Sequence, residues 1–408
     1  MIKVGLDIGN SKISSVVCDV RADGSKQVLS FISRPTNNLK KSTIINLELL
    51  RNEISKILSE AEKESETTIK SIILNIPAVE SLSVFTNSEI KINNEKINDL
   101  HLKKAINESN LMDPIEDYQT IQNLLIGYKL DNKILSSDPI GNYGNNLEVN
   151  FYKFAVKKNF AKTLTSLFNN LEIDIENFVP TPLSSALSTL NQDDKSLGAI
   201  CIDLGAGSSS ISLFENEKLI YMDSINIGGN NITNDIARGI PTTIDSAERL
   251  KTLYGSVISS PSDENELIEV PIIGDDLSKS KQINRSTVNL IIKPRVEENL
   301  ELLRQKLKEY DLHRKYIKNL VLTGGGSLLE GIADYAQIIF DSNVRLGKPK
   351  FIQGLKNEFL KPQFSQTLGT ILFEKNQFEI KYLKKKEKIK KNDVLSRFSS
   401  WLDKYIWL

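Results

Sequence analysis

The sequence contains very few of the residues that build zinc centres and disulfide bonds. Its 408 residues include two cysteines and two histidines. His101 and His313 have no cysteine or second histidine beside them, which argues against a zinc site. Cys18 and Cys201 both lie within apolar stretches, which favours buried free thiols. We therefore expect neither a zinc centre nor a disulfide.

A long apolar run and an excess of charge are also missing. No stretch of about 18 apolar residues offers a membrane-spanning helix. The first strand already contains Asp7, so we expect no signal peptide. Lys+Arg and Asp+Glu number 52 each, so no global field recruits nucleic acid. The composition is ordinary for a soluble globular protein with roughly two to four domains, and we expect the protein to be cytoplasmic.

The most informative motifs of the sequence are glycine-containing loops, and one of them lies near the middle of the chain. The stretch Ala199–Phe214 reads as two apolar strands joined by a turn that holds one carboxylate and small residues: Asp203, Gly205, Ala206, Gly207 and Ser208. Small side chains let backbone N–H groups approach a phosphate, and the carboxylate can hold a hydrated magnesium ion. A glycine-rich hairpin without a ligand is the alternative, and this loop alone does not decide between them.

Two further loops repeat the pattern. One lies at the start of the chain and contains Asp7, Gly9, Asn10, Ser11 and Lys12. The other follows an apolar strand at Leu320–Thr323 and contains Gly324, Gly325, Gly326 and Ser327. Two strand–Asp–Gly–strand hairpins far apart in one chain indicate a duplicated domain. A nucleotide clamped between the copies explains why each copy needs its own loop.

The three loops resemble the motifs of the actin, sugar-kinase and chaperone-ATPase superfamily. Asp7–Lys12 resembles its first phosphate motif, Ile202–Ser210 its second, and Thr323–Gly326 its adenosine motif. Within the superfamily, the segments Ala247–Gly255 and Ile292–Glu297 and the C-terminal tail resemble the FtsA family of bacterial cell-division proteins. The resemblance implies an α/β fold: a duplicated actin-like (ribonuclease-H-like) ATPase core with two inserted α+β subdomains and a C-terminal amphipathic helix.

The resemblance also divides the chain. We expect two core domains, two insertions, a linker and a terminal helix: 1–78 and 157–197 (first core domain), 79–156 (first insertion), 198–229 and 296–376 (second core domain), 230–295 (second insertion), 377–393 (lysine-rich flexible linker) and 394–408 (amphipathic helix). In the second insertion, the runs Val270–Gly274 and Val288–Lys293 predict strands. In the first, a strand is predicted at Ser81–Phe85 and a polar loop at Ser136–Asn146.

The ligands implied are ATP and Mg²⁺, with Asp203 and Asp7 holding the ion through water. Glu248 and Lys251 are three residues apart on one helix face and match the family's ribose contact; a surface ion pair is the alternative. Thr181 stands where many superfamily members carry an acidic residue or glutamine that orients the attacking water. We therefore expect no catalytic base and at most a slow ATPase.

The segment 394–408 is predicted to bind a membrane surface. At helical spacing all of its apolar side chains except Trp407 lie on one side, and those expected to enter the membrane are Phe398, Trp401, Leu402, Tyr405, Ile406 and Leu408. Seven of the eleven residues from 381 to 391 are lysine, which predicts a flexible linker and attraction to anionic lipid. A helix docked on the protein's own core is the alternative.

By resemblance, we expect an ATP-binding protein that polymerises on the inner face of the cytoplasmic membrane at the division site. It would be a peripheral protein that tethers FtsZ filaments by their C-terminal peptide, with later divisome proteins as further partners. Arg295 is the candidate contact, and an ion pair with Glu297 or Glu298 is the alternative. A pilus-assembly ATP-binding adaptor of the same superfamily is the second candidate. A small-molecule kinase is less favoured because no carboxylate base is identifiable.

Overall fold

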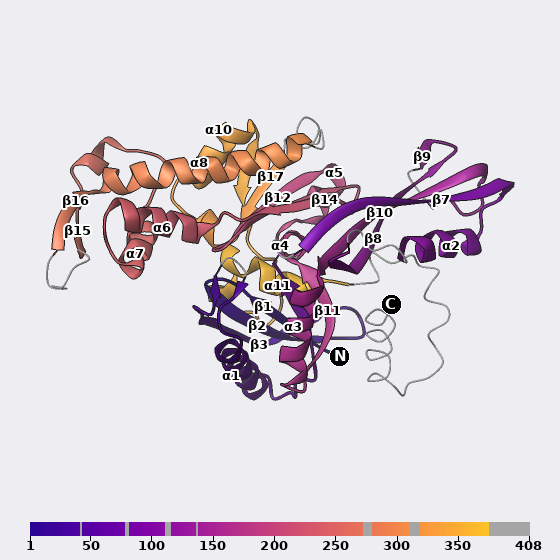
Figure 1. Ribbon diagram of the computed structural model, residues 1–408, viewed down its shortest axis with the longest axis horizontal. Coiled ribbons are helices and arrows are strands. Elements are labelled where there is room, and N and C mark those ends of the chain that lie inside the picture. The colour runs from indigo at the N-terminus through magenta and orange to yellow at the C-terminus, as the bar shows by residue number, and fades with distance from the viewer. Residues whose placement is uncertain are drawn as a thin grey trace.

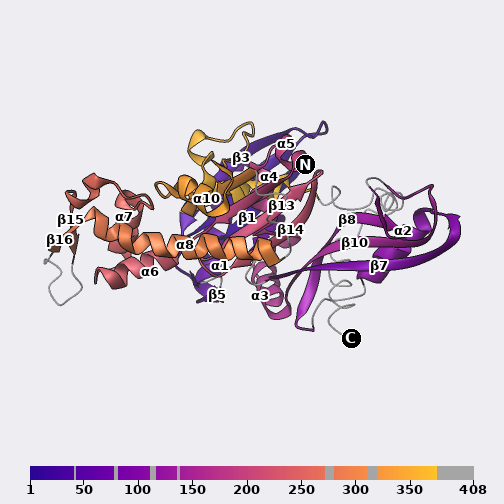
Figure 2. The same cartoon turned by 90° about the horizontal axis from the view of Figure 1, so that it is seen from above.

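Figure 1 shows a computed structural model of the chain, which describes residues 1–40, 43–77, 81–110, 116–135, 138–271, 280–309 and 319–374. Two five-stranded sheets form the centre, and an inserted module projects from each end of the molecule in both views (Figures 1 and 2). His313, the predicted linker at 377–393 and the predicted terminal helix at 394–408 lie outside the described residues. Among the described helices, none is long and apolar enough to cross a membrane.

The first repeat is the sheet with strand order β11-β6-β1-β2-β3. Strand β1 pairs antiparallel with β2 and parallel with β6. Helix α1 (Leu47–Ser65) packs on β2 and β3 and begins at Asn46, whose side chain accepts from two backbone N–H groups. Helix α3 (Lys158–Asn169) packs on β11. The strands, with the small hairpin β4-β5, are β1 (Ile2–Ile8), β2 (Lys12–Val20), β3 (Lys26–Pro35), β4 (Leu39–Lys40), β5 (Thr43–Ile44), β6 (Ser71–Ile76) and β11 (Asp174–Pro180).

The second repeat has the same topology in the order β18-β17-β12-β13-β14. Strand β12 pairs antiparallel with β13 and parallel with β17, as β1 does with β2 and β6. Asp7 lies opposite Ser14, and Asp203 lies opposite Ser210 at the same place in the second hairpin. The predicted duplication of an α/β core is therefore confirmed. The elements are α5 (Gln192–Leu197), β12 (Ala199–Leu204), β13 (Ser209–Glu215), β14 (Lys218–Ile225), β17 (Asn319–Thr323), α10 (Ile332–Phe340) and β18 (Asn343–Leu346).

Two helices cross between the repeats. Every residue of α4 (Thr181–Thr189) is buried, and α11 (Ser365–Leu372) packs tightly against it. A Cβ atom at Gly369 would overlap the main-chain carbonyl oxygen of Ser184. The two backbones therefore touch, and glycine is what allows this approach.

The chain between β18 and α11 runs back from the second repeat to the first. The N–H of Val28 on β3 donates to the carbonyl of Gln353 over 2.7 Å. Phe31 on β3 stacks on Phe359 at 4.3 Å and meets Phe364 edge to face at 5.3 Å. This segment, which contains η4 (Asn357–Phe359) and η5 (Pro362–Phe364), ties the two repeats together at the entrance to α11.

The first insertion forms its own four-stranded sheet in the order β7-β10-β8-β9, seen at the right of Figure 1. Its elements are β7 (Ser81–Lys96), α2 (Asp99–Asn110), β8 (Tyr118–Leu130), β9 (Lys133–Leu135) and β10 (Tyr143–Lys157). The predicted strand at Ser81–Phe85 is only the beginning of β7, and β10 starts within the predicted loop at Ser136–Asn146. The hydroxyl of Tyr152 bonds both the N–H and the carbonyl of Met222 on β14, so this insertion docks on the edge strand of the second repeat.

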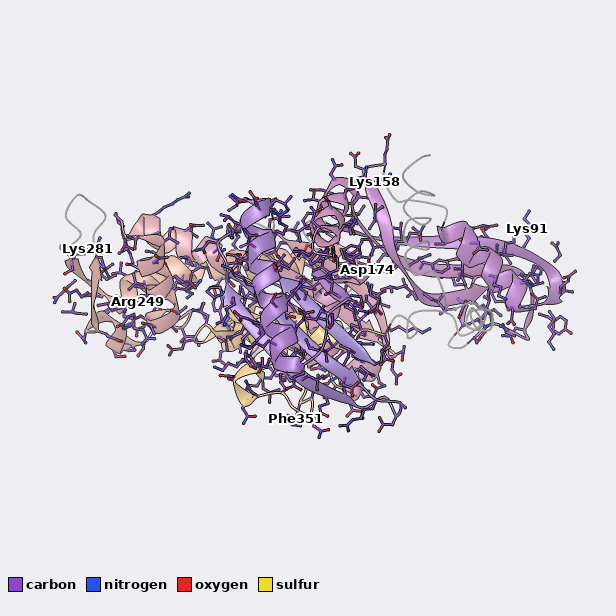
Figure 3. The ribbon with its side chains drawn as sticks, turned by 90° about the horizontal axis from the view of Figure 1, so that it is seen from below. Lys91, Lys158, Asp174, Arg249, Lys281 and Phe351 are labelled. Atoms are coloured by element: carbon purple, nitrogen blue, oxygen red, sulfur yellow. The ribbon has the colours of Figure 1, made fainter. Side chains whose placement is uncertain are left out.

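The second insertion lies at the opposite end, where Figure 3 labels Arg249 and Lys281. Its elements are α6 (Gly229–Gly239), α7 (Ile244–Tyr254), η2 (Pro261–Glu264), β15 (Leu267–Pro271), β16 (Ser280–Asn284) and the start of α8 (Arg285–Glu309). The predicted strand at Val288–Lys293 is wrong, because these residues belong to α8. The buried side chains of α8 recur every three or four residues, as packing along one helix face requires: Val288, Ile292, Val296, Leu300, Leu303 and Leu307. The helix accommodates Pro294 in its interior and runs across the predicted domain boundary at 295.

Gly369→Ala should lower the free energy of unfolding by about 1–3 kcal/mol or more, because α4 and α11 must separate to admit the methyl group. Urea unfolding followed by circular dichroism measures the change. Gly127→Ala on β8 is the matched control, since no atom lies within 4 Å of a Cβ at that position. Equal stability of the two variants would contradict the close crossing.

Candidate functional site

Two hairpin loops with the same local geometry lie at the carboxyl ends of β1 and β12. In the first, the N–H of Gly9 donates to the carbonyl of Lys12 over 3.0 Å; in the second, the N–H of Gly205 donates to the carbonyl of Ser208 over 3.0 Å. A Cβ at Gly205 would lie 2.7 Å from that carbonyl oxygen, so the turn requires glycine. The two loops are therefore equivalent parts of the two repeats.

The loops of the two repeats face each other. Asn10 of the first lies against Gly207 of the second, where a Cβ would overlap the Asn10 amide. The third loop joins them: Gly324, with φ of +83°, lies so close to Asp203 that a Cβ would be 2.5 Å from its Oδ1. The fold thus brings together three loops that are distant in sequence, as predicted.

The carboxylates of the two hairpin loops are buried, with 3% of Asp7 and 2% of Asp203 exposed. Asp7 accepts a 2.8 Å hydrogen bond from Nδ2 of Asn75. Asp203 accepts from the hydroxyl of Ser185 and from Nε2 of Gln366, which lies 3.1 Å from both carboxylate oxygens. Neutral donors therefore hold both acidic side chains in place.

Burial shifts the pKa of each charged group in the site. It raises the pKa of Asp203 to about 6, although hydrogen bonds from Ser185 and Gln366 lower it. It also raises the pKa of Asp7, against the attraction of Lys12. The pKa of Lys12 is itself lowered by burial, against the attraction of both carboxylates. Each side chain is held where its charged form is disfavoured.

These surroundings fit a divalent cation together with a phosphate group. A cation would offset the charge of Asp7 and Asp203, whose oxygen atoms suit hydrated Mg²⁺. Backbone N–H groups of the small loop residues and the ammonium of Lys12 would meet phosphate oxygens. Within the described parts of the chain, no cluster of three or more His, Cys, Asp or Glu side chains could enclose a metal ion. The predicted binding of the ion by Asp7 and Asp203 through water stays a prediction.

Helix α6 begins directly behind the second loop. The N–H of Gly229 donates to the carbonyl of Gly205 over 2.9 Å, and that of Asn230 donates to the carbonyl of Ala206 over 2.8 Å. Lys251 on α7 donates in turn to the carbonyl of Gly229 over 3.2 Å. The second insertion is thus connected to the second loop through the first turn of α6.

Glu248 and Lys251 form an ion pair, with Nζ and Oε2 2.6 Å apart. Both contact Thr233 on α6: its hydroxyl accepts from Lys251 over 2.8 Å and donates to Glu248. The Lys251 side chain is 13% exposed and that of Glu248 is 46% exposed, so the pair is half-buried and the predicted alternative of a surface ion pair stays open. The pair braces α7 on α6 beside the second loop, and the ribose contact stays a prediction.

The remaining loop residues differ in accessibility. Ser327 is buried, and its hydroxyl donates to the carbonyl of Gly324 over 2.7 Å, so it supports the third loop. Ser11 and Gly325 are exposed. A Cβ at Gly326 would lie 2.9 Å from the Cβ of Leu204, so this glycine packs directly on the end of β12.

Arg295 lies on α8 and pairs with Asp235 on α6, with Nε and Oδ2 2.5 Å apart, and with Glu298. The ion pair with Glu298, one of the predicted alternatives, is therefore present, and the partner contact stays a prediction. At the start of α4, the hydroxyl of Thr181 accepts from Nδ2 of Asn75 over 3.0 Å and donates to the carbonyl of Ile76 over 3.1 Å.

Sequence reasoning missed the residues that hold the two carboxylates, which are Asn75, Ser184, Ser185 and Gln366. Asn75 could have been found, since it is a polar side chain near the end of an otherwise apolar strand that pairs with β1. Ser185 and Gln366 carry no such signal, because only the crossing of α4 and α11 brings them to Asp203.

The chain is similar to curated cell-division proteins over most of its length. It is 31% identical to the cell division protein FtsA of Agrobacterium fabrum over 379 residues, which cover 90% of this chain and 86% of that protein. The chain belongs to the FtsA family. A family model described as cell division protein FtsA matches residues 200–369, which contain the second and third loops.

Other comparisons show the fold that the FtsA family shares with further proteins. A family model described as type IV pilus assembly protein PilM matches residues 5–256. The structure of a PilM-PilN type IV pilus biogenesis complex has a TM-score of 0.63 at 17% identity, covering 91% of this chain and 97% of that one. MreB5 of Spiroplasma citri bound to ADP has a TM-score of 0.55 at 14% identity, covering 92% and 97%. The predicted actin-like fold is thereby confirmed.

The raised pKa of Asp203 predicts a pH dependence of stability. Its folded pKa of about 6 exceeds the ordinary value of 3.8, so its stabilising contribution is present at low pH and is lost as pH rises through about 6. In the presence of a chelator, the contribution of Asp203 to the free energy of unfolding should fall by about 1–2 kcal/mol between pH 5 and pH 7.5. Asp203→Asn should lack this component in urea titrations at the two pH values; an identical pH dependence in both proteins would contradict the assignment.

Proposed function

We propose that this chain is an ATP-binding cell-division protein of the FtsA family that assembles on the membrane and tethers FtsZ. The observation that carries the nucleotide site is the pair of equivalent loops that face each other, each with a buried carboxylate. Asp203 and Asp7 would hold hydrated Mg²⁺, and Gly9, Gly205 and Lys12 would surround the phosphates. Bound Mg²⁺ would offset the charge of the phosphates and of both carboxylates.

The rest of the nucleotide would lie between the third loop and the second insertion. Gly324, Gly325 and Gly326 offer backbone next to the second loop, and the Glu248–Lys251 pair lies beside the start of α6. MreB5 of Spiroplasma citri, a protein of the same fold, has been crystallised with ADP. These observations support adenine-nucleotide binding by the present chain.

We infer that the nucleotide mainly regulates shape and is hydrolysed slowly. Thr181 supplies a hydroxyl where a catalytic carboxylate would be expected, and that hydroxyl is engaged with Asn75 and Ile76. Without a positioned base, the attacking water gains little activation. A bound nucleotide would then favour one protomer shape suited to filament contacts, as a population shift.

Membrane attachment rests on the sequence of the terminal segment. At helical spacing, residues 394–408 would place most of their apolar side chains on one side, and the lysine-rich 377–393 would add attraction to anionic lipid. A single such helix binds reversibly, and many helices on one filament bind together far more strongly. The protein would then be peripheral on the inner face of the cytoplasmic membrane.

A pilus-assembly adaptor is the second candidate. The match of the PilM family model to residues 5–256 and the likeness to the PilM-PilN complex favour it. Such an adaptor would need the nucleotide core but neither FtsZ nor an amphipathic terminus. Binding to FtsZ and to lipid therefore distinguishes the two candidates.

Asp203→Ala should weaken magnesium-dependent ATP binding by about 1–3 kcal/mol, because a charge-assisted contact is lost. Titration calorimetry with and without Mg²⁺ measures the affinity. Asp174→Ala removes an exposed carboxylate on β11 and is the matched control. Undiminished affinity of Asp203→Ala would refute the assigned site.

Deletion of 394–408 should abolish sedimentation with anionic liposomes while ATP binding is retained. Trp401→Glu should weaken lipid binding more than about tenfold, because it would place a charge on the apolar side of the expected helix. Ser400→Glu makes the same charge change on the polar side and should keep most of the binding. A protein without this segment that still sediments with liposomes would show that the anchor lies elsewhere.

Arg295→Glu should weaken binding of the FtsZ C-terminal peptide at least about tenfold, because a charge reversal within a contact is strongly unfavourable. Fluorescence anisotropy with a labelled peptide measures the affinity. Arg249→Glu, an exposed position on α7 of the same insertion, is the control, and thermal unfolding verifies both folds. Equal peptide affinity of the two variants would remove Arg295 from the contact.

A further inference from the structure

Two adjacent serines on α4 connect this helix to the carboxylates of both repeats. The hydroxyl of Ser185 donates to Asp203 of the second repeat. The hydroxyl of Ser184 donates to Oδ1 of Asn75 over 3.0 Å, and Nδ2 of Asn75 donates to Asp7 of the first repeat over 2.8 Å. Both serines are fully buried. A displacement of either carboxylate would therefore change the hydrogen bonds of the same turn of α4.

The other crossing helix holds the same carboxylate. Gln366, in the first turn of α11, has its Nε2 atom 3.1 Å from both oxygens of Asp203. One turn further along, Gly369 lies against the carbonyl of Ser184. Asp203 is thus attached to α4 through Ser185 and to α11 through Gln366, at the point where the two helices touch.

These contacts leave Asp203 able to accept a further hydrogen bond. A carboxylate offers about four lone-pair positions on its two oxygens. Ser185 occupies one position on Oδ2, and the bifurcated bond from Gln366 uses one on each oxygen. Oδ1 retains a position for a water molecule of a hydrated cation. Ser185 and Gln366 can therefore stay in place when the site is filled.

We propose that Ser185 and Gln366 are positioning residues that couple occupancy of the site to the relative orientation of the two repeats. This proposal rests on the proposed nucleotide site. A cation and phosphates between the loops draw Asp203 and Asp7 toward one centre. The hydrogen bonds link Asp203 to α4, which packs on β12, β13 and β14 of the second repeat, and to α11, which packs on β1, β2 and β6 of the first. A movement of Asp203 would therefore shift the two helices, and the sheets on which they pack, relative to each other. A ligand shifts such an equilibrium only through contacts that differ between the two states, and these two bonds supply that difference.

The test measures, in the full-length chain, the distance between the first repeat and the second insertion, which α8 connects to the second repeat. Cysteines introduced by Lys56→Cys on α1 and Arg249→Cys on α7 carry spin labels, both positions being exposed. The native thiols, Cys18 and Cys201, are buried and do not compete for label. Pulsed dipolar spectroscopy with and without saturating Mg-ATP then reports the change in distance.

Three single substitutions are compared in this labelled background. Ser185→Ala and Gln366→Leu each remove one donor to Asp203. Ser188→Ala is the matched control, because its hydroxyl is buried on the same helix but donates to the carbonyl of Ser185 over 2.9 Å. A fluorescent ATP analogue measures nucleotide occupancy in the same samples. Loss of stability alone would not alter the distance change in the folded fraction.

The unsubstituted chain and Ser188→Ala should show the same nucleotide-dependent change in distance. In Ser185→Ala and Gln366→Leu that change should be at least halved at full occupancy. An undiminished change in Gln366→Leu overturns the proposal even if Ser185→Ala fails to fold, and so does an unsubstituted chain that binds ATP without any change in distance. A chain that binds no ATP analogue overturns the proposed nucleotide site and this inference with it.

Discussion

The structure depends on two buried carboxylates, one contributed by each repeat. Asp7 and Asp203 end equivalent strands and lie where a charged side chain is poorly solvated. A buried negative charge is unfavourable unless donors or cations offset it. Lys12 and a set of neutral donors provide part of this compensation, and burial still raises the pKa of both acids. Such surroundings would favour a bound cation. The small residues of the loops would leave room for the phosphate group of a ligand.

Contacts within the fold connect Asp7 and Asp203 to the two crossing helices and to the insertions. Asp203 accepts from Ser185 of α4, and Asp7 is linked to the same helix through Asn75 on β6 and Ser184. Helix α4 in turn contacts α11 closely where Gly369 meets Ser184. The two insertions project from opposite ends of the molecule (Figure 2), and the first, which lies in the chain of the first repeat, also contacts the second repeat. Tyr152 bonds the backbone of β14, and α8 runs without interruption from the second insertion into the core of the second repeat. A change in the angle between the repeats, as proposed above, would therefore alter the positions of both insertions relative to the repeats.

Much of the fold could be predicted because its signals are local. Each loop follows an apolar strand and carries glycine where the backbone leaves no room for a side chain, and the order of such motifs revealed the duplication. The interpretation failed at Val288–Lys293, where a run of apolar residues suits a strand as well as a helix until the longer repeat from Val288 to Leu307 is considered. Ser185 and Gln366 could not be predicted, since the packing of two helices brings them to Asp203. The roles assigned to Arg295 and to the Glu248–Lys251 pair stay predictions.

Hydrogen exchange of the three loops tests the central claim most directly, because a nucleotide held between the repeats must contact backbone N–H groups from both of them. Exchange rates would be compared in buffer alone, with Mg²⁺ and with Mg-ATP. The account predicts slower exchange with Mg-ATP at Gly9–Lys12, Gly205–Ser208 and Gly324–Gly326 together, and little change with Mg²⁺ alone. Protection confined to one repeat, or unchanged exchange in all three loops, would contradict a nucleotide clamped between the two copies.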